Sequence, residues 1–254
     1  MTRSPRLGAR YLLTPVNSVR YFEFDFAAAC LPSAPGRCLD VSSPRLFSLY
    51  AASTRPSAQI TVLNPSPQDI AETRTALKAL ALDNIEARLS GVDTLRSCTC
   101  EYDSIWSISV VEHVDGAYDD REAVRWMYAS LKPGGRLILT VPVDRRYWVE
   151  YRDVDHYGRQ SATDTGQYFF QRFYDEAAVR SRLIGPIGRA PVMTRWFGEK
   201  VPGHFQTYMA KWLRDGVGAT VNDPREIADH YLAFDTWEAM PGIGVVGLLF
   251  EKPY

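Results

Sequence analysis

The chain alternates between short apolar runs and longer segments whose apolar residues recur at a helical spacing. The runs are rich in valine, isoleucine and leucine, which is typical of strands buried on both faces of a parallel sheet. Turn-forming residues bound most of the runs, as expected where a strand leads into a helix. Five runs have this character, at residues 36–43, 59–66, 85–92, 102–111 and 136–143.

The first two helices are expected at residues 14–31 and 44–54. The leading segment is amphipathic and carries several aromatic side chains. For the second helix, we expect Ser43 as the N-cap and Pro44 as the first helical residue. A serine hydroxyl can accept a hydrogen bond from a free N–H group there, and proline has no N–H group to leave unsatisfied.

Two further helices follow. Asp69 and Glu72 resemble a capping box for a helix that continues to about Leu82. The next helix, before the fifth apolar run, ends at the breaker sequence 133–135. Its apolar residues recur at the i, i+3, i+4, i+7 spacing of one helix face, namely Val124, Met127, Tyr128 and Leu131.

Strands that alternate with helices predict an α/β protein with an open, doubly wound, Rossmann-like sheet of mostly parallel strands. The loop after the fourth strand carries Glu112 and His113. Folds of this class bind their ligands at the carboxyl ends of the parallel strands. We therefore expect this loop to border the functional site.

The pattern changes after Val143. Residues 144–174 are rich in aromatic side chains and arginine and have no sustained period, which is typical of a lid or binding loop. Three elements are expected beyond it, a helix at 175–184, a mostly helical cap at 186–242 and a last strand at 244–253. The length predicts a single domain, 1–254, in which residues 144–242 contain the lid and the insertions on the substrate side.

Composition limits the possible partners. The net charge is -1, so the chain lacks the basic excess that nucleic acids and anionic membranes attract. No apolar run approaches the roughly 18 to 20 residues that span a bilayer, and the N-terminal residues do not resemble an export signal. We expect a cytoplasmic protein without a nucleic-acid or membrane partner. Cys98 and Cys100 lack the second pair of a tetrahedral zinc site, so no metal is expected.

Two segments carry a family resemblance. YDSIWSISVVEHV at 102–114 and LKPGGRLILTVP at 131–142, taken together, resemble the class I S-adenosylmethionine-dependent methyltransferases, specifically a type 11-like branch. The resemblance covers roughly residues 15–143 and returns at the last strand. It implies a sheet of about seven strands, six parallel and one antiparallel, in which the last strand of the chain is the antiparallel one. It also implies S-adenosylmethionine as the cofactor.

The resemblance also implies cofactor contacts. Asp40 falls where the family places an acid near the amino group of the methionine moiety, although a turn or capping role also fits an aspartate there. Asp93 falls where an acid holds the adenine amino group, or else it is a surface-turn residue. Ser109 would line the floor beneath the methionine moiety. Tyr21 would close over the cofactor or pack in the core.

The chain departs from the family at two positions. The glycines that normally follow Asp40 are replaced by the sequence Ser-Ser-Pro-Arg at 42–45, a degenerate motif I that leaves less room for the cofactor. Ser42 would supply a hydroxyl in place of a backbone donor. Where the family usually has an acid for the ribose hydroxyls, the chain has Asn64. Its neutral amide weakens that contact by about 1 kcal/mol, and it is also a good turn residue.

Methyl transfer to oxygen requires a base that removes a proton from the acceptor. His113 is the first candidate, because its loop borders the predicted site and a histidine ordinarily has a pKa of about 6.5. The Glu112–His113 pair also fits a purely structural role in the loop. His156 and Tyr157, in the predicted lid, are alternative catalytic residues, and His204 is a weaker one.

The favoured function is transfer of a methyl group from S-adenosylmethionine to an oxygen or nitrogen of a small-molecule acceptor. Two alternatives keep the fold without methyl transfer, namely a biosynthetic cyclase or isomerase and an inactive partner subunit. A nicotinamide oxidoreductase is disfavoured, because no glycine fingerprint follows the first strand. The arginines of 144–174 suit an anionic, sugar-like or aromatic acceptor, or they are simply solvated.

Overall fold

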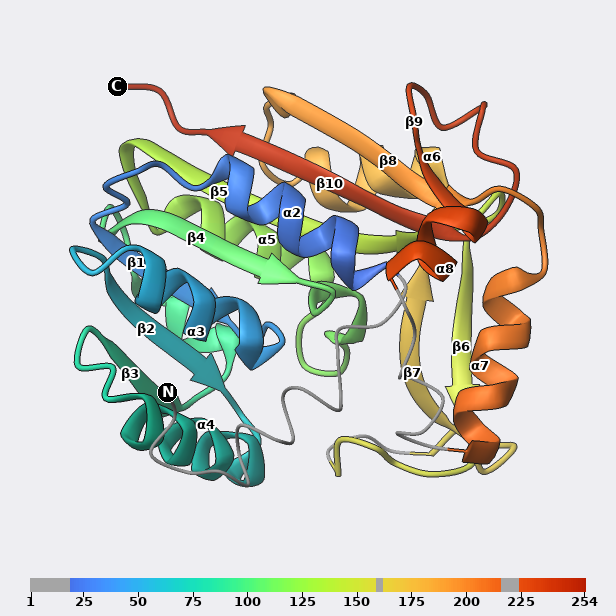
Figure 1. Ribbon diagram of the computed structural model, residues 1–254, viewed down its shortest axis with the longest axis horizontal. Coiled ribbons are helices and arrows are strands. Elements are labelled where there is room, and N and C mark those ends of the chain that lie inside the picture. Colours follow the sequence, from blue (N-terminus) through green and yellow to red (C-terminus); the bar gives the residue numbers. More distant parts are fainter. Residues whose placement is uncertain (1–18, 159–161, 216–223) are drawn as a thin grey trace.

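A sheet of eight strands forms the centre of the protein (Figure 1). The computed structural model describes residues 19–158, 162–215 and 224–254. The strands of this sheet are β1 (Arg37–Val41), β2 (Gln59–Asn64), β3 (Ile85–Leu89), β4 (Tyr102–Ile108), β5 (Leu131–Val143), β8 (Met193–Glu199), β9 (Tyr231–Phe234) and β10 (Gly244–Glu251). They lie in the order β3-β2-β1-β4-β5-β10-β8-β9.

The directions of the strands confirm the doubly wound fold. β1 to β5 are parallel to one another, whereas β10 is antiparallel to both β5 and β8. β8 therefore points the same way as β5, and β10 is the antiparallel strand that the family resemblance implies. β9 pairs antiparallel with β8 and adds one more strand at the edge. The strand order reverses between β1 and β4, where folds of this class bind ligands.

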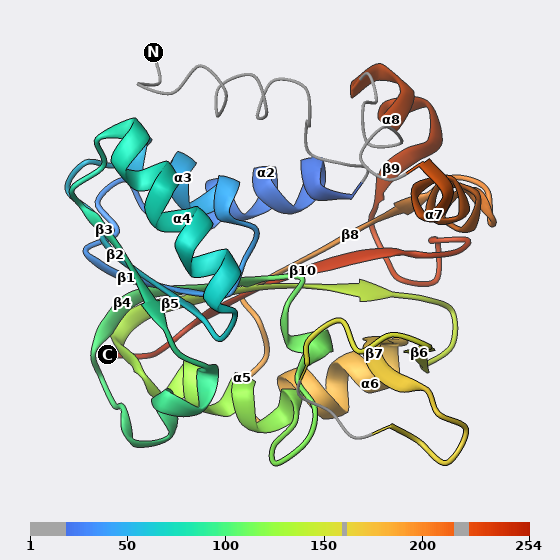
Figure 2. The same cartoon turned by 90° about the horizontal axis from the view of Figure 1, so that it is seen from below.

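Helices cover both faces of the sheet (Figure 2). One face carries α2 (Arg20–Cys30), α3 (Arg45–Thr54) and α4 (Pro67–Leu80), and the other carries α5 (Asp120–Ala129) and α6 (Glu176–Ala178), which continues as a π-helix over Val179–Ile184. Each face has its own apolar core, with Phe47 and Trp106 fully buried in one and Met127 and Leu183 in the other. No helix in the described ranges is both long and apolar enough to cross a membrane.

The segment after β5 is more regular than the sequence predicts. Residues 144–174 contain an antiparallel pair, β6 (Trp148–Arg152) and β7 (Tyr168–Phe173), in place of a wholly irregular lid. The rings of Trp148 and Phe173 stack across the pair, with their centroids 4.2 Å apart. The mostly helical cap expected at 186–242 is wrong in part, because β8 and β9 extend the sheet there. Helices in that range are α7 (His204–Asp215) and α8 (Pro224–His230).

Two expected helix caps are wrong. Helix α4 begins after Ser66, whose hydroxyl accepts a hydrogen bond from the N–H of Asp69, so Asp69 is not the capping residue. Helix α3 begins after Pro44 without a side-chain cap. The hydroxyl of Ser43 instead accepts a hydrogen bond from the N–H of Ile108 at 3.0 Å and thereby ties the turn to β4.

The end of α5 also differs from the prediction. The helix stops at Ala129, and Leu131 is the first residue of β5, where it pairs with Tyr102. Strand pairing with β4 therefore overrides the helical spacing of Leu131. Of the leading helix expected at 14–31, residues 14–18 lie outside the described residues, and α2 begins at Arg20.

Helix α2 packs against β10 at a glycine. A Cβ atom at Gly247 would lie 2.6 Å from Cδ1 of Phe26, which is far below an ordinary carbon–carbon contact. Phe26 is buried in the core on this face of the sheet. The absence of a side chain at Gly247 thus sets how closely α2 approaches the sheet.

We expect Gly247→Ala to lower the free energy of unfolding by about 1–3 kcal/mol, because the added methyl group overpacks the contact with Phe26. Urea unfolding of the variant measures this loss. Phe26→Leu in the same chain makes room, so the double variant should lose less stability than the two single losses added together. Additive losses would contradict the packing described here.

Candidate functional site

Two cavities at the carboxyl ends of the parallel strands meet beside the loop after β4, and a third lies at the turn after β1. The first, which we call the edge cavity, has a volume of about 570 Å³. Its lining includes Ser42 after β1, Asn64 at the end of β2 and Ser109 after β4, together with Tyr118 and Tyr157. Its position at the reversal of strand order is the usual ligand site of such a sheet, and its volume is in the range of small-molecule pockets.

The second cavity, which we call the aromatic cavity, has a volume of about 240 Å³. Its lining comes mainly from β7, α7 and the start of β10, and it includes Phe170, Phe173, Phe205, Met209 and Ile243. Ser109 and His113 line both cavities. The two cavities therefore meet at the residues that follow β4.

Asp40 supports the turn after β1 from below. The side chain is fully buried and does not line either cavity. Its carboxylate accepts hydrogen bonds from the N–H of Ser43 at 2.9 Å and from the hydroxyl of Ser48. Burial raises the pKa of Asp40, although these hydrogen bonds oppose the shift. The structure thus places Asp40 behind the turn. A direct contact with a ligand ammonium would require the carboxylate at the cavity surface.

Ser42 occupies the position of a motif I glycine with a glycine-like backbone. Its φ angle is +56°, in the left-handed region that costs a residue with a side chain about 1 kcal/mol. Its N–H and its hydroxyl both donate to the carbonyl oxygen of Leu63, at 2.8 and 3.0 Å. The side chain is thereby turned toward β2, and Ser42 lines an open cavity where the sequence predicted crowding.

Of Asn64, Asp93 and Tyr21, which are also expected to contact the cofactor, only Asn64 lines the edge cavity. Its side-chain oxygen accepts a hydrogen bond from the N–H of Ser66 at 2.8 Å. Asp93 lies on the exposed 3₁₀ helix η1 (Val92–Ser97) beside the cavity, where it accepts a hydrogen bond from Tyr118 at 3.2 Å. Tyr21 is half-buried on α2 and lines neither cavity.

His113 lies at the junction of the cavities, at the end of the 3₁₀ helix η2 (Val111–His113). Its Nδ1 atom is 2.7 Å from the carbonyl oxygen of Phe170 and 2.8 Å from the hydroxyl of Tyr157. A carbonyl oxygen can only accept, so this contact assigns the proton of the neutral ring to Nδ1. The lone pair of the ring then lies on Nε2, which is 3.8 Å from Oε1 of Glu112.

The structure brings the expected catalytic residues together around Phe170. The ring of Tyr157 is stacked on Phe170 at 5.9 Å, and His156 meets the same ring edge-on at 5.3 Å. His156 and Tyr157 both line the edge cavity. His204 lies apart from them, because it stacks on His230 at 3.8 Å and lines neither cavity.

A buried acid under the junction was missed in the sequence. Glu23 of α2 accepts hydrogen bonds from the hydroxyls of Ser109 and Thr140, and Arg20 donates to its other oxygen at 2.6 Å. These bonds hold Ser109 in a left-handed conformation with a φ angle of +48°. The sequence does contain an indication of this role, because Glu23 interrupts the aromatic face of its helix. An acid is rarely buried in such a face without a partner.

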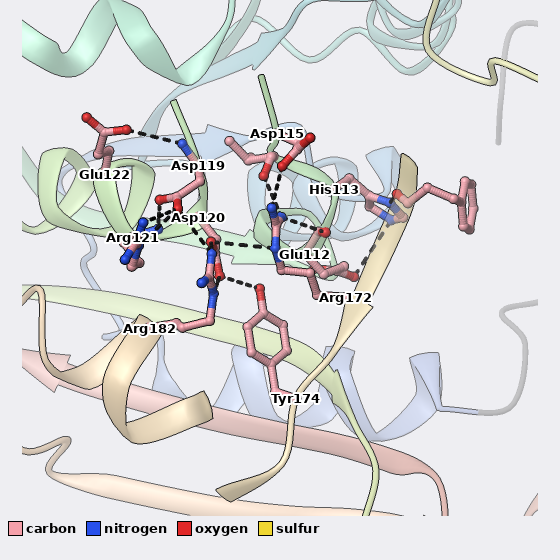
Figure 3. A network of polar contacts seen from close by, with 12 residues as sticks. Glu112, His113, Asp115, Asp119, Asp120, Arg121, Glu122, Arg172, Tyr174 and Arg182 are labelled. Atoms are coloured by element: carbon pink, nitrogen blue, oxygen red, sulfur yellow. Dashed lines mark hydrogen bonds and ion pairs between the residues drawn. The ribbon is translucent and has the colours of Figure 1, made fainter. Parts of the chain in front are cut away.

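Arginine side chains fix the loop that carries His113 (Figure 3). Arg172 of β7 donates to the carbonyl oxygen of Val114 at 2.6 Å and to Asp115 at 2.5 Å. Nearby, the hydroxyl of Tyr174 donates to Asp120 at 2.8 Å, and Arg182 donates to the same carboxylate at 2.9 Å. Charge-assisted bonds of this kind are stronger than neutral ones. Strand β7 and the η2 loop are therefore held in one arrangement.

Comparison with known proteins finds a similar domain and a shared fold. Residues 39–139 match the family model of type 11 methyltransferase domains, described as a methyltransferase domain. Residues 39–139 are therefore similar to a methyltransferase domain, and the fold is that of the class I methyltransferases, the class whose methyl donor is S-adenosylmethionine. A search of curated proteins found no match.

Solved structures share the fold at low sequence identity. The [4+2]-cyclase SpnF is 17% identical with a TM-score of 0.57, and the match covers 91% of this chain and 79% of that one. Coclaurine N-methyltransferase bound to N-methylheliamine and SAH is 13% identical with a TM-score of 0.57, over 92% and 72%. Geranyl diphosphate C-methyltransferase from Streptomyces coelicolor A3(2) is 13% identical with a TM-score of 0.53, over 91% and 76%.

The buried carboxyl of Glu112 predicts a pH-dependent stability. Burial, with a further contribution from Glu23, raises the pKa of Glu112 well above its usual 4.5. The folded chain then binds this proton more tightly than the unfolded chain. The resulting stabilisation is fully present below about pH 4.5, the unfolded pKa, and is lost as the pH rises through the folded value.

Glu112→Gln cannot titrate, so its free energy of unfolding relative to the native chain should rise as the pH increases above about 4.5. Urea unfolding of both proteins at a series of pH values measures the difference, in which the other titrating groups cancel. A difference that stays constant, or that falls with increasing pH, would contradict the direction of the pKa shift of Glu112.

Proposed function

We propose that the protein transfers a methyl group from S-adenosylmethionine, bound in the edge cavity, to an oxygen or nitrogen of a small molecule bound in the aromatic cavity. The observation that carries this proposal is the meeting of the two cavities at Ser109 and His113. A donor in one cavity and an acceptor in the other would face each other there, as an in-line displacement requires.

The residues of the edge cavity fit the parts of the cofactor. Ser42 and Ser109 would lie beside the methionine moiety, and the amide of Asn64 would contact the ribose hydroxyls. Tyr118, which lines the cavity, and Asp93 at its rim would lie near the adenine. The Ser42 side chain points toward β2, and this supports the fit. The cavity keeps the space that a motif I glycine normally leaves for the cofactor. In this proposal Asp40 acts through the turn that it holds.

The bound cofactor supplies an electrophilic methyl group on a sulfonium. In the proposed reaction, Nε2 of His113 accepts the proton of the acceptor hydroxyl or amine. The carbonyl oxygen of Phe170 keeps the imidazole in the tautomer that leaves Nε2 free of a proton. Tyr157 also lies at this ring, at 2.8 Å from Nδ1. His156 and Tyr157 would cover the edge cavity and keep water from the reacting groups.

We also propose that the chain is one domain in which residues 144–242 supply the acceptor side. Within that range, β7 and α7 contribute Phe170, Phe173, Phe205 and Met209 to the aromatic cavity. These side chains offer apolar contacts to an acceptor. Differences in this segment would then set which acceptor is used, while the sheet holds the cofactor.

A cyclase or isomerase without methyl transfer is the second candidate. Two observations favour it, namely the similarity in fold to the [4+2]-cyclase SpnF and the serine at the glycine position of motif I. Turnover separates the two functions. S-adenosylmethionine labelled at its methyl group yields a labelled product only if methyl transfer occurs.

Calorimetric titration with S-adenosylmethionine tests the cofactor site. We expect the native chain to bind, and we expect Asn64→Asp to bind about fivefold to tenfold more tightly, because a carboxylate makes a stronger hydrogen bond with the ribose hydroxyls. The matched control is Gln68→Glu, which adds the same charge in the first turn of α4 at a residue that does not line the cavity. If the native chain does not bind S-adenosylmethionine at millimolar concentration, the proposal is refuted. If both variants gain the same affinity, the gain comes from the added negative charge and not from a contact between residue 64 and the ribose.

His113→Asn tests the proposed base. An asparagine amide can still donate to the carbonyl oxygen of Phe170 but has no group that replaces Nε2. With a panel of phenols and amines as acceptors, we expect turnover to fall by about 10²-fold to 10⁴-fold and the affinity for S-adenosylmethionine to stay nearly unchanged. His156→Asn is the comparison variant and should lose less. A larger loss in His156→Asn would move the role of base to His156.

A further inference from the structure

The wall of the aromatic cavity contains one buried acid that its neighbours leave partly unsatisfied. Glu112 lines the cavity and is 1% exposed. Its Oε2 atom has no hydrogen-bond partner among the described residues. A buried polar atom without a partner costs about 1–3 kcal/mol. A ligand that offers a hydrogen bond to Glu112 would recover part of this cost.

The two arginines that line the aromatic cavity near Glu112 are already engaged. Arg20 is paired with Glu23 at 2.6 Å. Arg152 is paired with Glu150 at 2.8 Å.

Arg172 does not neutralise Glu112 either. It contacts the backbone carbonyl of Glu112 at 3.5 Å, not the carboxyl group, and its ion pairs are with Asp115 and Asp120 (Figure 3). The carboxyl group of Glu112 therefore has no arginine of its own.

The charge state of Glu112 follows from this environment. Burial and the nearby Glu23 carboxylate raise the pKa of Glu112 well above its usual value. A neutral carboxylic acid can donate one hydrogen bond and accept others. The raised pKa disfavours the charged form of Glu112, and the two lining arginines are paired with Glu23 and Glu150, so among the described residues the cavity offers a carboxylate no unpaired arginine.

We propose that Glu112 is a specificity-determining residue and that the aromatic cavity takes a neutral, mainly apolar acceptor with a hydroxyl or carbonyl oxygen hydrogen-bonded to the Glu112 carboxyl group. The inference rests on the proposed function only in treating this cavity as the acceptor site. It narrows the substrate class from any small oxygen or nitrogen acceptor to neutral oxygen-bearing aromatic or aliphatic compounds. Phenols are the simplest members of that class.

Three small probes of similar shape test the inference, namely phenol, toluene and benzylammonium. Their affinities are measured by NMR, with the methyl signals of Ile243 and Val245 reporting binding in the aromatic cavity, which both residues line. The native chain should bind phenol about tenfold more tightly than toluene, the value of one net hydrogen bond. It should bind benzylammonium more weakly than phenol.

Variants locate the preference. Glu112→Leu should bind phenol and toluene equally, whereas Glu112→Gln, which keeps hydrogen-bonding groups, should retain the preference for phenol. The matched control is Gln171→Leu, which removes another polar side chain of the same wall. That variant should keep the preference, because the amide of Gln171 is already bonded to Glu150 at 2.6 Å.

The inference is overturned if the native chain binds toluene as tightly as phenol, if it binds benzylammonium most tightly, or if a folded Glu112→Leu keeps the preference for phenol. Should Glu112→Leu fail to fold, the three probes on the native chain and on Glu112→Gln still decide. Glu112 does not line the edge cavity, so S-adenosylmethionine titration of the same proteins tests the cofactor site separately. Cofactor binding without a phenol preference refutes the inference alone, and the reverse result refutes the cofactor proposal alone.

Discussion

The turn after β1 is the constraint on which the candidate site depends, and a buried carboxyl holds it from below. Asp40 fixes the N–H of Ser43 and the hydroxyl of Ser48, while Ser42 bonds twice to the carbonyl oxygen of Leu63. These bonds offset the roughly 1 kcal/mol cost of a left-handed serine. They also keep its side chain turned toward β2. A chain without motif I glycines thereby retains an open cavity at the reversal of strand order.

A second set of bonds fixes the side of the site next to the aromatic cavity. Arg172 holds the carbonyl oxygens after β4, and Glu23 holds Ser109 from the opposite face of the sheet. The junction of the two cavities is therefore set by groups from α2, β4 and β7. Reacting groups must be positioned within a fraction of an ångström for efficient transfer. This fixed arrangement is consistent with the proposed role of His113 as a base. In that proposal the buried acid Glu23 also helps to position the residues at the junction.

The sequence predicted the elements with strong local patterns. The positions of the five parallel strands and of β10 could be predicted because buried strands form continuous apolar runs, whereas the antiparallel direction of β10 was implied by the family resemblance. The pair β6 and β7 was missed because aromatic residues lie on both of its faces, and Leu131 was misplaced because strand pairing overrides helical spacing. His113, His156 and Tyr157 were named, but their meeting at Phe170 depends on a contact between segments distant in the chain. The burial of Glu23 and Glu112 depends on tertiary packing in the same way.

A crystal structure of the protein in complex with S-adenosylhomocysteine tests most directly the central claim, that the edge cavity holds the cofactor. The account predicts this ligand in the edge cavity, with its amino acid end beside Ser42 and Ser109, its ribose at Asn64 and its sulfur facing the aromatic cavity across His113. The side chain of Ser42 should remain bonded to Leu63. A ligand bound elsewhere, or a Ser42 side chain that moves to fill the cavity while the ligand stays out, would contradict it.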